Sequence, residues 1–360
     1  LEYAAVIRSV SHVRTIELYS IISKWSRNAW FIDFTTFPMI ALKAASVATA
    51  VAVTHAATLY SNVTKANHTC ALKPSMWSCS LQAMDLANLD TCCTETFGGL
   101  VAQTQFWDTY TGREDHGQLL PKNHWTLHGL WPDFCNGSFT QYCDLDRQYD
   151  PNPSPAEFDG KKVPAYNGTS IDNFIKDWER YDLLNYMKTY WVSQGQANEG
   201  FWAHEFSKHA TCYSTFDVPC YGPKYQKHQD VIEFFDTAVA YFRERPTYDW
   251  LKKEHIVPSN KTGYSLKDIE GALTKHYGAL PYIGCHGPKY NETDEGKGSD
   301  DDGYTVLSEV WYFNHVKGRV QDLDAKHVNS TTPTHCAKSK NAIRYYERSH
   351  SSECSAKVPY

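Results

Sequence analysis

Residues 125–132 read Trp125-Thr126-Leu127-His128-Gly129-Leu130-Trp131-Pro132, a single histidine within a run of apolar and aromatic residues. Such a run is typical of a buried strand, and a proline cannot continue the hydrogen bonding of a central strand. We therefore predict a strand that ends at Pro132. Upstream, residues 100–110 are rich in β-branched and aromatic side chains and predict a central strand.

A second distinctive stretch follows at residues 201–212. It reads Phe201-Trp202-Ala203-His204-Glu205-Phe206-Ser207-Lys208-His209-Ala210-Thr211-Cys212. Its histidines are similar to the zinc-protease pattern H-E-x-x-H, but that pattern needs two histidines four residues apart. A step of five places His204 and His209 about 140° apart around an ideal helix, so both could not face one ion without distortion. We therefore expect no metal site and no cofactor.

Together the two stretches hold five side chains that can perform acid–base chemistry on a phosphate. These are His128, His204, Glu205, Lys208 and His209. Histidine titrates near neutral pH, so a neutral and a protonated imidazole can act as base and acid in one site. RNA supplies its own nucleophile, the 2′-hydroxyl, and its trans-esterification leaves a 2′,3′-cyclic phosphate. The G-x-S-x-G pattern of serine hydrolases is absent from the sequence.

Each of these residues also has a purely structural interpretation. A single histidine in a tryptophan-rich strand usually packs and forms hydrogen bonds, which would describe His128 alone. Trp125 and Trp131 alone would be core residues. Glu205 and Lys208 could form a surface ion pair, which contributes little stability. The presence of both stretches in one chain favours the catalytic interpretation.

The rest of the chain mixes helical and strand patterns without a repeat, which indicates an α+β domain. Apolar residues at helical spacing predict helices over residues 170–191, 230–245 and 265–277. Strands are predicted over residues 304–310, 311–316 and 342–346. Residues 150–167 and 287–303 are polar and predict loops. The net charge is −6, so any attraction to a nucleic acid has to be local to a cleft.

Cysteines and glycosylation sequons indicate a secretory route. The chain has 11 cysteines without two matched zinc knuckles, which favours disulfides and an oxidising compartment. Sequons for N-glycosylation start at Asn62, Asn67, Asn136, Asn167, Asn260, Asn291 and Asn329. We expect a secreted glycoprotein, with a vacuolar or lysosome-like compartment as the other destination.

The N-terminal region resembles a signal peptide that begins at an internal methionine. Met39 is followed by Lys43, the small apolar run 44–53 and small residues up to Ala57. We interpret 1–38 as an upstream extension or mistranslated segment, 39–57 as a signal peptide and 58–360 as the folded domain, with its core at about 69–350. The alternative is a membrane anchor, which the short run of mainly Ala, Val and Thr disfavours. We expect no stable membrane association.

The two stretches resemble the motifs of the ribonuclease T2 family. Residues 125–132 match one motif, and residues 204–212 are a version of its second motif, H-E-W-x-K-H-G-T-C. The resemblance runs from about Cys70 to about Cys336 and is greatest to the fungal branch, which carries an N-terminal cysteine cluster. It implies one ribonuclease T2-type catalytic domain, with a central antiparallel sheet packed with helices and stapled by disulfides.

This resemblance implies a monomeric, secreted endoribonuclease that acts on single-stranded RNA with low base specificity. His209 matches the general base and His128 the general acid. His204 matches a phosphate-binding histidine, and Glu205 and Lys208 match the groups that stabilise the transition state. The alternative is a catalytically silent secreted family member that acts as a binding or toxic protein.

The resemblance also implies a base-binding site and points to three departures. Trp131 matches an indole that stacks on a base, and Asp133 a carboxylate that accepts from a base amino group. Phe139 lies where fungal relatives can carry a base-stacking tyrosine. Phe206 and Ala210 replace the usual tryptophan and glycine of the second motif.

The fungal pattern further implies five disulfides. The pairs are Cys70–Cys93, Cys79–Cys135, Cys92–Cys220, Cys143–Cys212 and Cys285–Cys336. Cys354 is left without an assigned partner.

Overall fold

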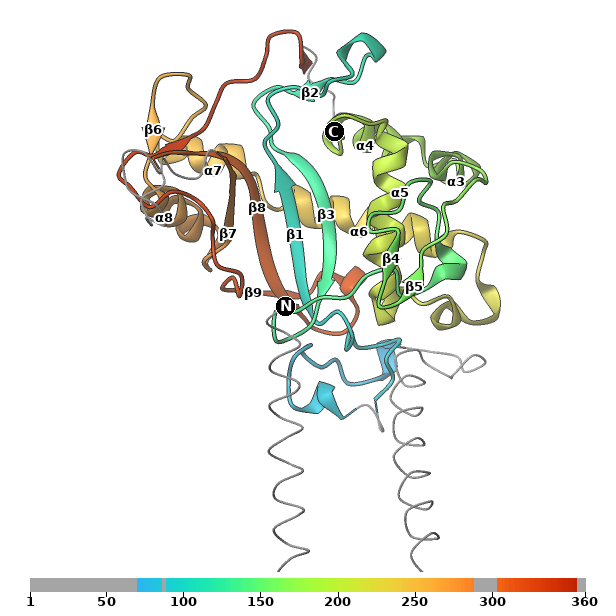
Figure 1. Cartoon of the computed structure of the whole chain (residues 1–360). Coiled ribbons are helices and arrows are strands. Elements are labelled where there is room, and N and C mark those ends of the chain that lie inside the picture. Colours follow the sequence, from blue (N-terminus) through green and yellow to red (C-terminus); the bar gives the residue numbers. More distant parts are fainter. Residues whose placement is uncertain (1–69, 86–88, 288–302, 355–360) are drawn as a thin grey trace, which may run out of the picture. The chain divides into compact units, whose positions relative to one another are not determined.

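The computed structural model describes residues 70–85, 89–287 and 303–354, all of which belong to one compact unit, Thr58–Tyr360 (Figure 1). The predicted upstream extension and signal peptide, and the sequons at Asn62, Asn67 and Asn291, lie outside these residues, as does the side chain of Cys354. Within the described ranges, no helix combines the length and the apolar character needed to cross a membrane.

A seven-stranded sheet holds the centre of the fold. Its strand β1 (Leu100–Phe106) pairs antiparallel with β3 (Thr126–Asp133) on one side and with β8 (Thr305–Val316) on the other. The other members are β6 (Gly263–Tyr264), β7 (Tyr282–His286), β9 (Ala325–Val328) and β10 (Ile343–Arg344). Only the β8–β10 pair is parallel among the described strands of this sheet, so the predicted α+β fold with a mainly antiparallel sheet is confirmed.

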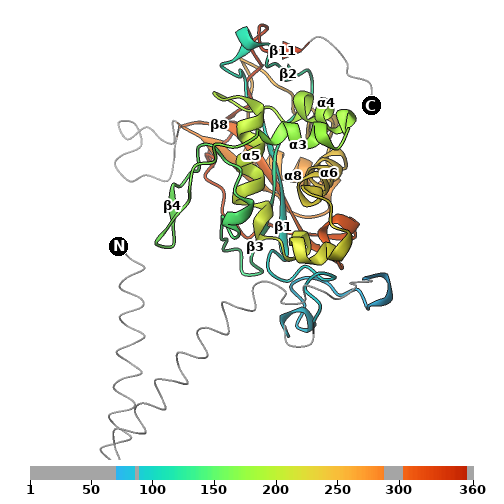
Figure 2. The same cartoon turned by 90° about the vertical axis from the view of Figure 1, so that its right-hand side faces the viewer.

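Helices form two groups around the sheet. The helices α3 (Ile171–Asp177), α4 (Tyr181–Tyr190), α5 (Asn198–Lys208) and α6 (Gln229–Arg243) share a core with β1 and β3. Figure 2 shows these four helices from their outer side. The helices α7 (Thr247–Lys253) and α8 (Leu266–Tyr277) share a second core with β7, β8 and β10. The first group brings α5, with the second histidine stretch, against β3 with the first.

Short elements complete the described chain. There are two further two-stranded sheets among the described residues. In one, β2 (Leu120–Pro121) pairs with β11 (Glu353–Cys354), and in the other, β4 (Glu157–Phe158) pairs with β5 (Lys161–Lys162). The 3₁₀ turns are Cys70–Leu72, Gln82–Met84, Glu114–His116, Leu145–Arg147, Ala210–Cys212, Ser214–Phe216, Val218–Lys224 and Val320–Asp322.

Several elements differ from the sequence predictions. The helix predicted over 170–191 is broken between α3 and α4, because Glu179 has a left-handed φ of 54° that an α-helix cannot contain. The two strands predicted over 304–316 form the single strand β8. The loop predicted over 150–167 contains the β4–β5 hairpin.

Five disulfides tie these elements together. They join Cys70 to Cys93, Cys79 to Cys135, Cys92 to Cys220, Cys143 to Cys212 and Cys285 to Cys336. These are the five pairs that the family pattern implied. The Cys143–Cys212 bond is the one nearest the candidate site, because it links the segment before Asp150 to the turn that follows His209.

Candidate active site

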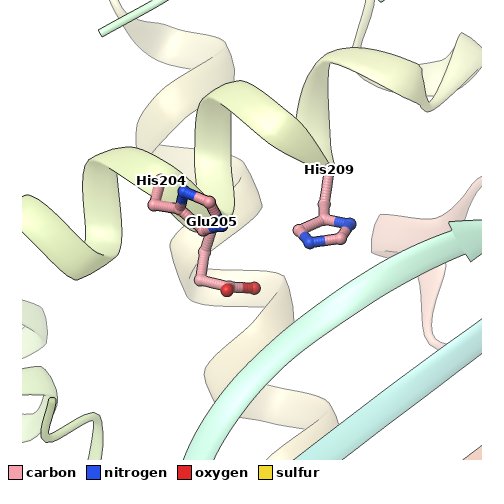
Figure 3. A group of neighbouring side chains, drawn as sticks. All are labelled: His204, Glu205 and His209. Atoms are coloured by element: carbon pink, nitrogen blue, oxygen red, sulfur yellow. The ribbon is translucent and has the colours of Figure 1, made fainter. Parts of the chain in front are cut away.

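The two histidine stretches meet where β3 lies against α5. Glu205, on α5, is the meeting point: its Oε1 lies 3.4 Å from Nε2 of His128 on β3. Figure 3 shows His204, Glu205 and His209 projecting from the last turns of α5 and its end. Lys208, one turn further along α5, is close enough to Glu205 that the negative charge of Glu205 opposes the lowering of the Lys208 pKa by burial. The structure therefore brings together all five residues that the sequence predicts as catalytic.

His128 owes its position to a β-bulge. In the β1–β3 register Gln105 faces Leu127 and Thr104 faces Gly129, so His128 is the additional residue on β3. A bulge changes the direction of the side chain it carries and occurs often beside active sites. The imidazole stacks on the Phe106 ring, with 3.7 Å between ring centroids. This packing restricts the ring while its two nitrogens stay available to the neighbouring carboxylates.

Two carboxylates flank the His128 ring. Nδ1 lies 2.6 Å from Oε1 of Glu309 on β8, and Nε2 faces Glu205. Burial alone would lower the pKa of His128, but the charges of Glu205 and Glu309 and the hydrogen bond to Glu309 outweigh it and raise the pKa to about 9. The ring is therefore protonated at neutral pH, with Nδ1 held by Glu309 and Nε2 directed into the site.

Glu205 is the buried charge at the centre of the site, with 1% of its surface exposed. Its Oε2 accepts a hydrogen bond from Nε1 of Trp131 at 2.8 Å. Burial opposes ionisation, but the positive charge of His128 prevails and lowers the pKa of Glu205 to about 2. Oε1 accepts no hydrogen bond from any described residue. The carboxylate is therefore ionised, and its buried Oε1 faces Nε2 of His128.

Gly129 makes this approach of Glu205 to β3 possible. A Cβ atom at position 129 would lie 2.1 Å from Oε2 of Glu205 and 2.5 Å from Nε1 of Trp131. Both distances are well inside van der Waals contact, so any side chain here would displace the Trp131–Glu205 hydrogen bond. The glycine that follows His128 in the first stretch thus has a steric role in the site.

His209 lies directly after the end of α5. The helix α5 stops at Lys208, and His209 has φ −110° and ψ −54°, away from ideal helical values. Its ring stacks on Trp131 with 4.9 Å between centroids. Burial, the first cause, lowers the pKa of His209 to about 3, and the nearby cation Lys208 acts in the same direction. The imidazole is therefore neutral at neutral pH, opposite to His128.

The end of the helix also corrects one sequence argument. Potential ligand atoms of His204, Glu205 and His209 all lie within 4.8 Å of one another (Figure 3). The prediction that His204 and His209 face too far apart was wrong because it assumed an ideal helix through residue 209. Among the described residues, these three are the group that could hold a metal ion.

His204 is oriented by a carboxylate that the sequence analysis did not identify. Its Nδ1 lies 2.8 Å from Oδ2 of the buried residue Asp150, which also accepts a hydrogen bond from the Tyr142 hydroxyl at 3.2 Å. Asp150 and Glu309 are separated from their histidines by 54 and 181 residues. No local motif relates residues so distant, so only a tertiary structure could identify these two partners.

The three residues predicted to bind a base occupy different surroundings. Asp133 and Phe139 are bridge partners, and the Phe139 ring is 64% exposed. Burial raises the pKa of Asp133 to about 7, so its carboxyl group is neutral in acidic solution and can then donate as well as accept. The Trp131 indole is engaged with Glu205 and His209. Base binding by these residues stays a prediction.

The two departures in the second stretch fit the fold. Phe206 is fully buried and packs against Tyr149, Phe234 and Phe235. Ala210 opens a right-handed 3₁₀ turn, a conformation that alanine adopts without strain. Neither substitution therefore disturbs the local backbone.

Replacing Glu309 by Gln is expected to lower the pKa of His128 by about one pH unit, because an opposite charge this close stabilises the imidazolium. The pKa of His128 falls because loss of the negative charge of Glu309 destabilises the protonated ring, which then releases its proton at lower pH. NMR titration of the His128 ring protons measures this. Glu254→Gln, which breaks a contact to His276 instead, is the matched control. An unchanged His128 titration in the Glu309 variant would refute the assignment.

Comparisons with known proteins agree with this geometry. A model of the ribonuclease T2 family matches residues 98–343. Ribonuclease Trv of Hypocrea rufa is 38% identical over 235 residues, which are 65% of this chain and 81% of that protein. Ribonuclease T2 of Aspergillus oryzae is 34% identical over 269 residues, 74% of this chain and 81% of that protein.

The chain covers 45% of the ribonuclease T2-like protein of Emericella nidulans, to which it is 36% identical over 232 residues. Among solved structures, Actibind, described as a T2 ribonuclease, superposes with a TM-score of 0.57 and 32% identity. That match covers 76% of this chain and 96% of Actibind.

Proposed function

Because this chain belongs to the ribonuclease T2 family and is similar to its fungal members, we propose that it is an endoribonuclease that cleaves single-stranded RNA through a 2′,3′-cyclic phosphate. The main support for this proposal is that His128 and His209, which lie on either side of the buried carboxylate of Glu205, have opposite protonation states. His128 holds a proton and His209 lacks one, as an acid–base pair requires.

The first step is an attack of the RNA on its own phosphate. His209 accepts the proton of the 2′-hydroxyl, whose oxygen then bonds to phosphorus. His128 donates a proton from Nε2 to the departing 5′-oxygen as the P–O5′ bond breaks. The anionic phosphodiester raises the pKa of His209 when it binds beside the ring, which makes His209 a stronger base in the complex.

The remaining groups stabilise the charge that develops on phosphorus. Lys208 lies close enough to Glu205 and Asp150 for both negative charges to act on its ammonium group, and Asp150 fixes the His204 ring. Preorganised donors of this kind, in a site with little water, stabilise a transition state more than they would in solution. Glu205 keeps His128 protonated until the leaving group takes the proton. In the second step the two histidines exchange roles, and water opens the cyclic phosphate.

The same proposal includes secretion as a monomeric glycoprotein with low base specificity. Support comes from the five disulfides, which persist in oxidising compartments. The described sequons also have exposed asparagines: Asn136, Asn167, Asn260 and Asn329. The alternative of a catalytically silent binding protein is disfavoured because all five catalytic-type residues converge.

The test is cleavage of a single-stranded RNA by the purified chain in excess EDTA. We expect cleavage, fragments that end in 2′,3′-cyclic phosphate by mass spectrometry, and no cut after a nucleotide that lacks its 2′-hydroxyl. The matched control is the same oligonucleotide with the 2′-hydroxyl restored. Absence of cleavage, a requirement for added metal, or cleavage after the 2′-deoxy position would each contradict the proposal.

A further inference from the structure

A pocket of about 290 Å³ lies beside the candidate active site, along the first half of α5. One wall is formed by Gln196, just before the helix, and by Glu199 and Ala203 on it. The opposite wall includes Tyr149, Asn152 and Tyr166. The volume is close to the lower end of the range for small-molecule sites, about 300 Å³. None of these residues takes part in the chemistry proposed above.

The pocket shares two chain segments with the candidate phosphate-binding residue His204. Gly200, which also lines it, lies one helical turn before His204 and on the same face of α5. On the opposite wall, Asp150 lies in the chain between the lining residues Tyr149 and Pro151 and bonds to the His204 ring. The segment that orients His204 therefore also forms a wall of the pocket. The pocket therefore lies beside the segments that position His204, where a further nucleotide of a bound strand could enter it.

Two tyrosine rings give the pocket an aromatic wall. Tyr149 and Tyr166 meet edge to face, with 5.4 Å between centroids. Tyr149 is supported by Phe174 and Phe206, and the Tyr166 amide donates to the Asp150 carbonyl at 3.0 Å. Tyr166 also lies directly over Gly168, where a Cβ atom would be 2.3 Å from the tyrosine hydroxyl. Supported aromatic rings of this kind are the usual stacking partners of single-stranded bases.

The polar groups of the lining are suited to a base edge rather than to a phosphate. Gln196 and Asn152 carry amides that both donate and accept hydrogen bonds, whereas Glu199 in its ionised form only accepts. Lysine and arginine do not line the pocket in the described structure. A carboxylate there repels a phosphate but can accept from the exocyclic amino group of adenine, cytosine or guanine. Uracil has no exocyclic amino group and offers only its N3–H as a base-edge donor.

We propose that this pocket, here called the α5 pocket, binds the base of an RNA nucleotide beyond the two that flank the cleaved bond. It favours adenine, cytosine or guanine over uracil because of Glu199. This inference rests on the proposed ribonuclease activity and extends it to the substrate class: the site takes three or more nucleotides. Tyr166 supplies stacking and Glu199 supplies the discrimination between bases.

The experiment compares kcat/KM on a dinucleotide with that on trinucleotides extended by adenosine or uridine at either end. For the wild-type chain, an adenosine at one of the two ends is expected to raise kcat/KM on the order of tenfold, the scale of one stacked base. Uridine at that end should raise it less. Tyr166→Ala should remove the gain, and Glu199→Gln should keep a gain but reduce the preference for adenosine.

The dinucleotide provides the internal control, because it is too short to reach the α5 pocket. Its cleavage should be unchanged in both variants, which also shows that they fold. Tyr181→Ala, at an exposed tyrosine outside the pocket, should behave as wild type on every substrate. If the wild-type chain cleaves neither the dinucleotide nor a longer single-stranded RNA, the proposed function fails. If it does, but no extension raises kcat/KM or the gain survives Tyr166→Ala, the α5 pocket proposal is overturned.

Discussion

Replacing His128 by Phe is expected to reduce kcat on RNA by about 10²–10⁴-fold, the usual contribution of a positioned general acid. Phenylalanine retains the stacking on Phe106 but cannot protonate the departing 5′-oxygen. It also leaves Glu205 and Glu309 without their cationic partner, which costs stability. His128→Asn is the companion variant, because its amide can donate to Glu309 without supplying a proton. Circular dichroism and initial rates on RNA measure both effects.

A substrate with an activated leaving group shows whether a His128 variant has lost only its general acid or has lost its structure as a whole. A uridine 3′-(4-nitrophenyl phosphate) releases nitrophenolate, which needs no proton from the enzyme. Both His128 variants should cleave it at rates near wild type, whereas His209→Phe should lose activity on both substrates because the attacking hydroxyl still needs a base. Normal RNA cleavage by the His128 variants, or equal losses on the two substrates, would reject the assignment.

Removing the Cys143–Cys212 disulfide with the double variant Cys143→Ser and Cys212→Ser should lower the free energy of unfolding by about 4 kcal/mol. The reason is the entropy that the unfolded chain regains when the cross-link, of sequence separation 69, is opened. Because this bond ties the segment before Asp150 to the turn after His209, kcat/KM should fall as well. Denaturant unfolding and rates on RNA give the two readouts.

The matched control is the double variant Cys285→Ser and Cys336→Ser. That disulfide has a comparable sequence separation of 51 and joins β7 to Cys336, and neither end carries one of the five catalytic-type residues, although β7 pairs with β8 beside Glu309. We expect a similar loss of stability and little change in kcat/KM. If both double variants lose activity equally under conditions where both are folded, the Cys143–Cys212 bond has no special role in the site.

Predictions from the sequence were most successful where a local pattern has one structural solution. The helices α6 and α8 follow from short-range spacing, and the first histidine stretch forms the strand β3, although that strand runs through Pro132 to Asp133 instead of ending at Pro132. They failed where one residue changes the backbone. Glu179 divides the helix predicted over 170–191, and the end of α5 at Lys208 redirects His209. Short β-strands such as β7 were missed because sheet pairing, rather than their own sequence, defines them.

By itself, the sequence determined which groups can react: three imidazoles, a carboxylate and a lysine in two recognisable stretches. Only the tertiary structure decided what state those groups are in. His128 is protonated because Glu309, 181 residues away, and Glu205 surround it, whereas His209 is neutral because burial removes it from water. Identical imidazoles reach opposite protonation states because a pKa depends on desolvation and neighbouring charges, which exist only once distant segments pack together.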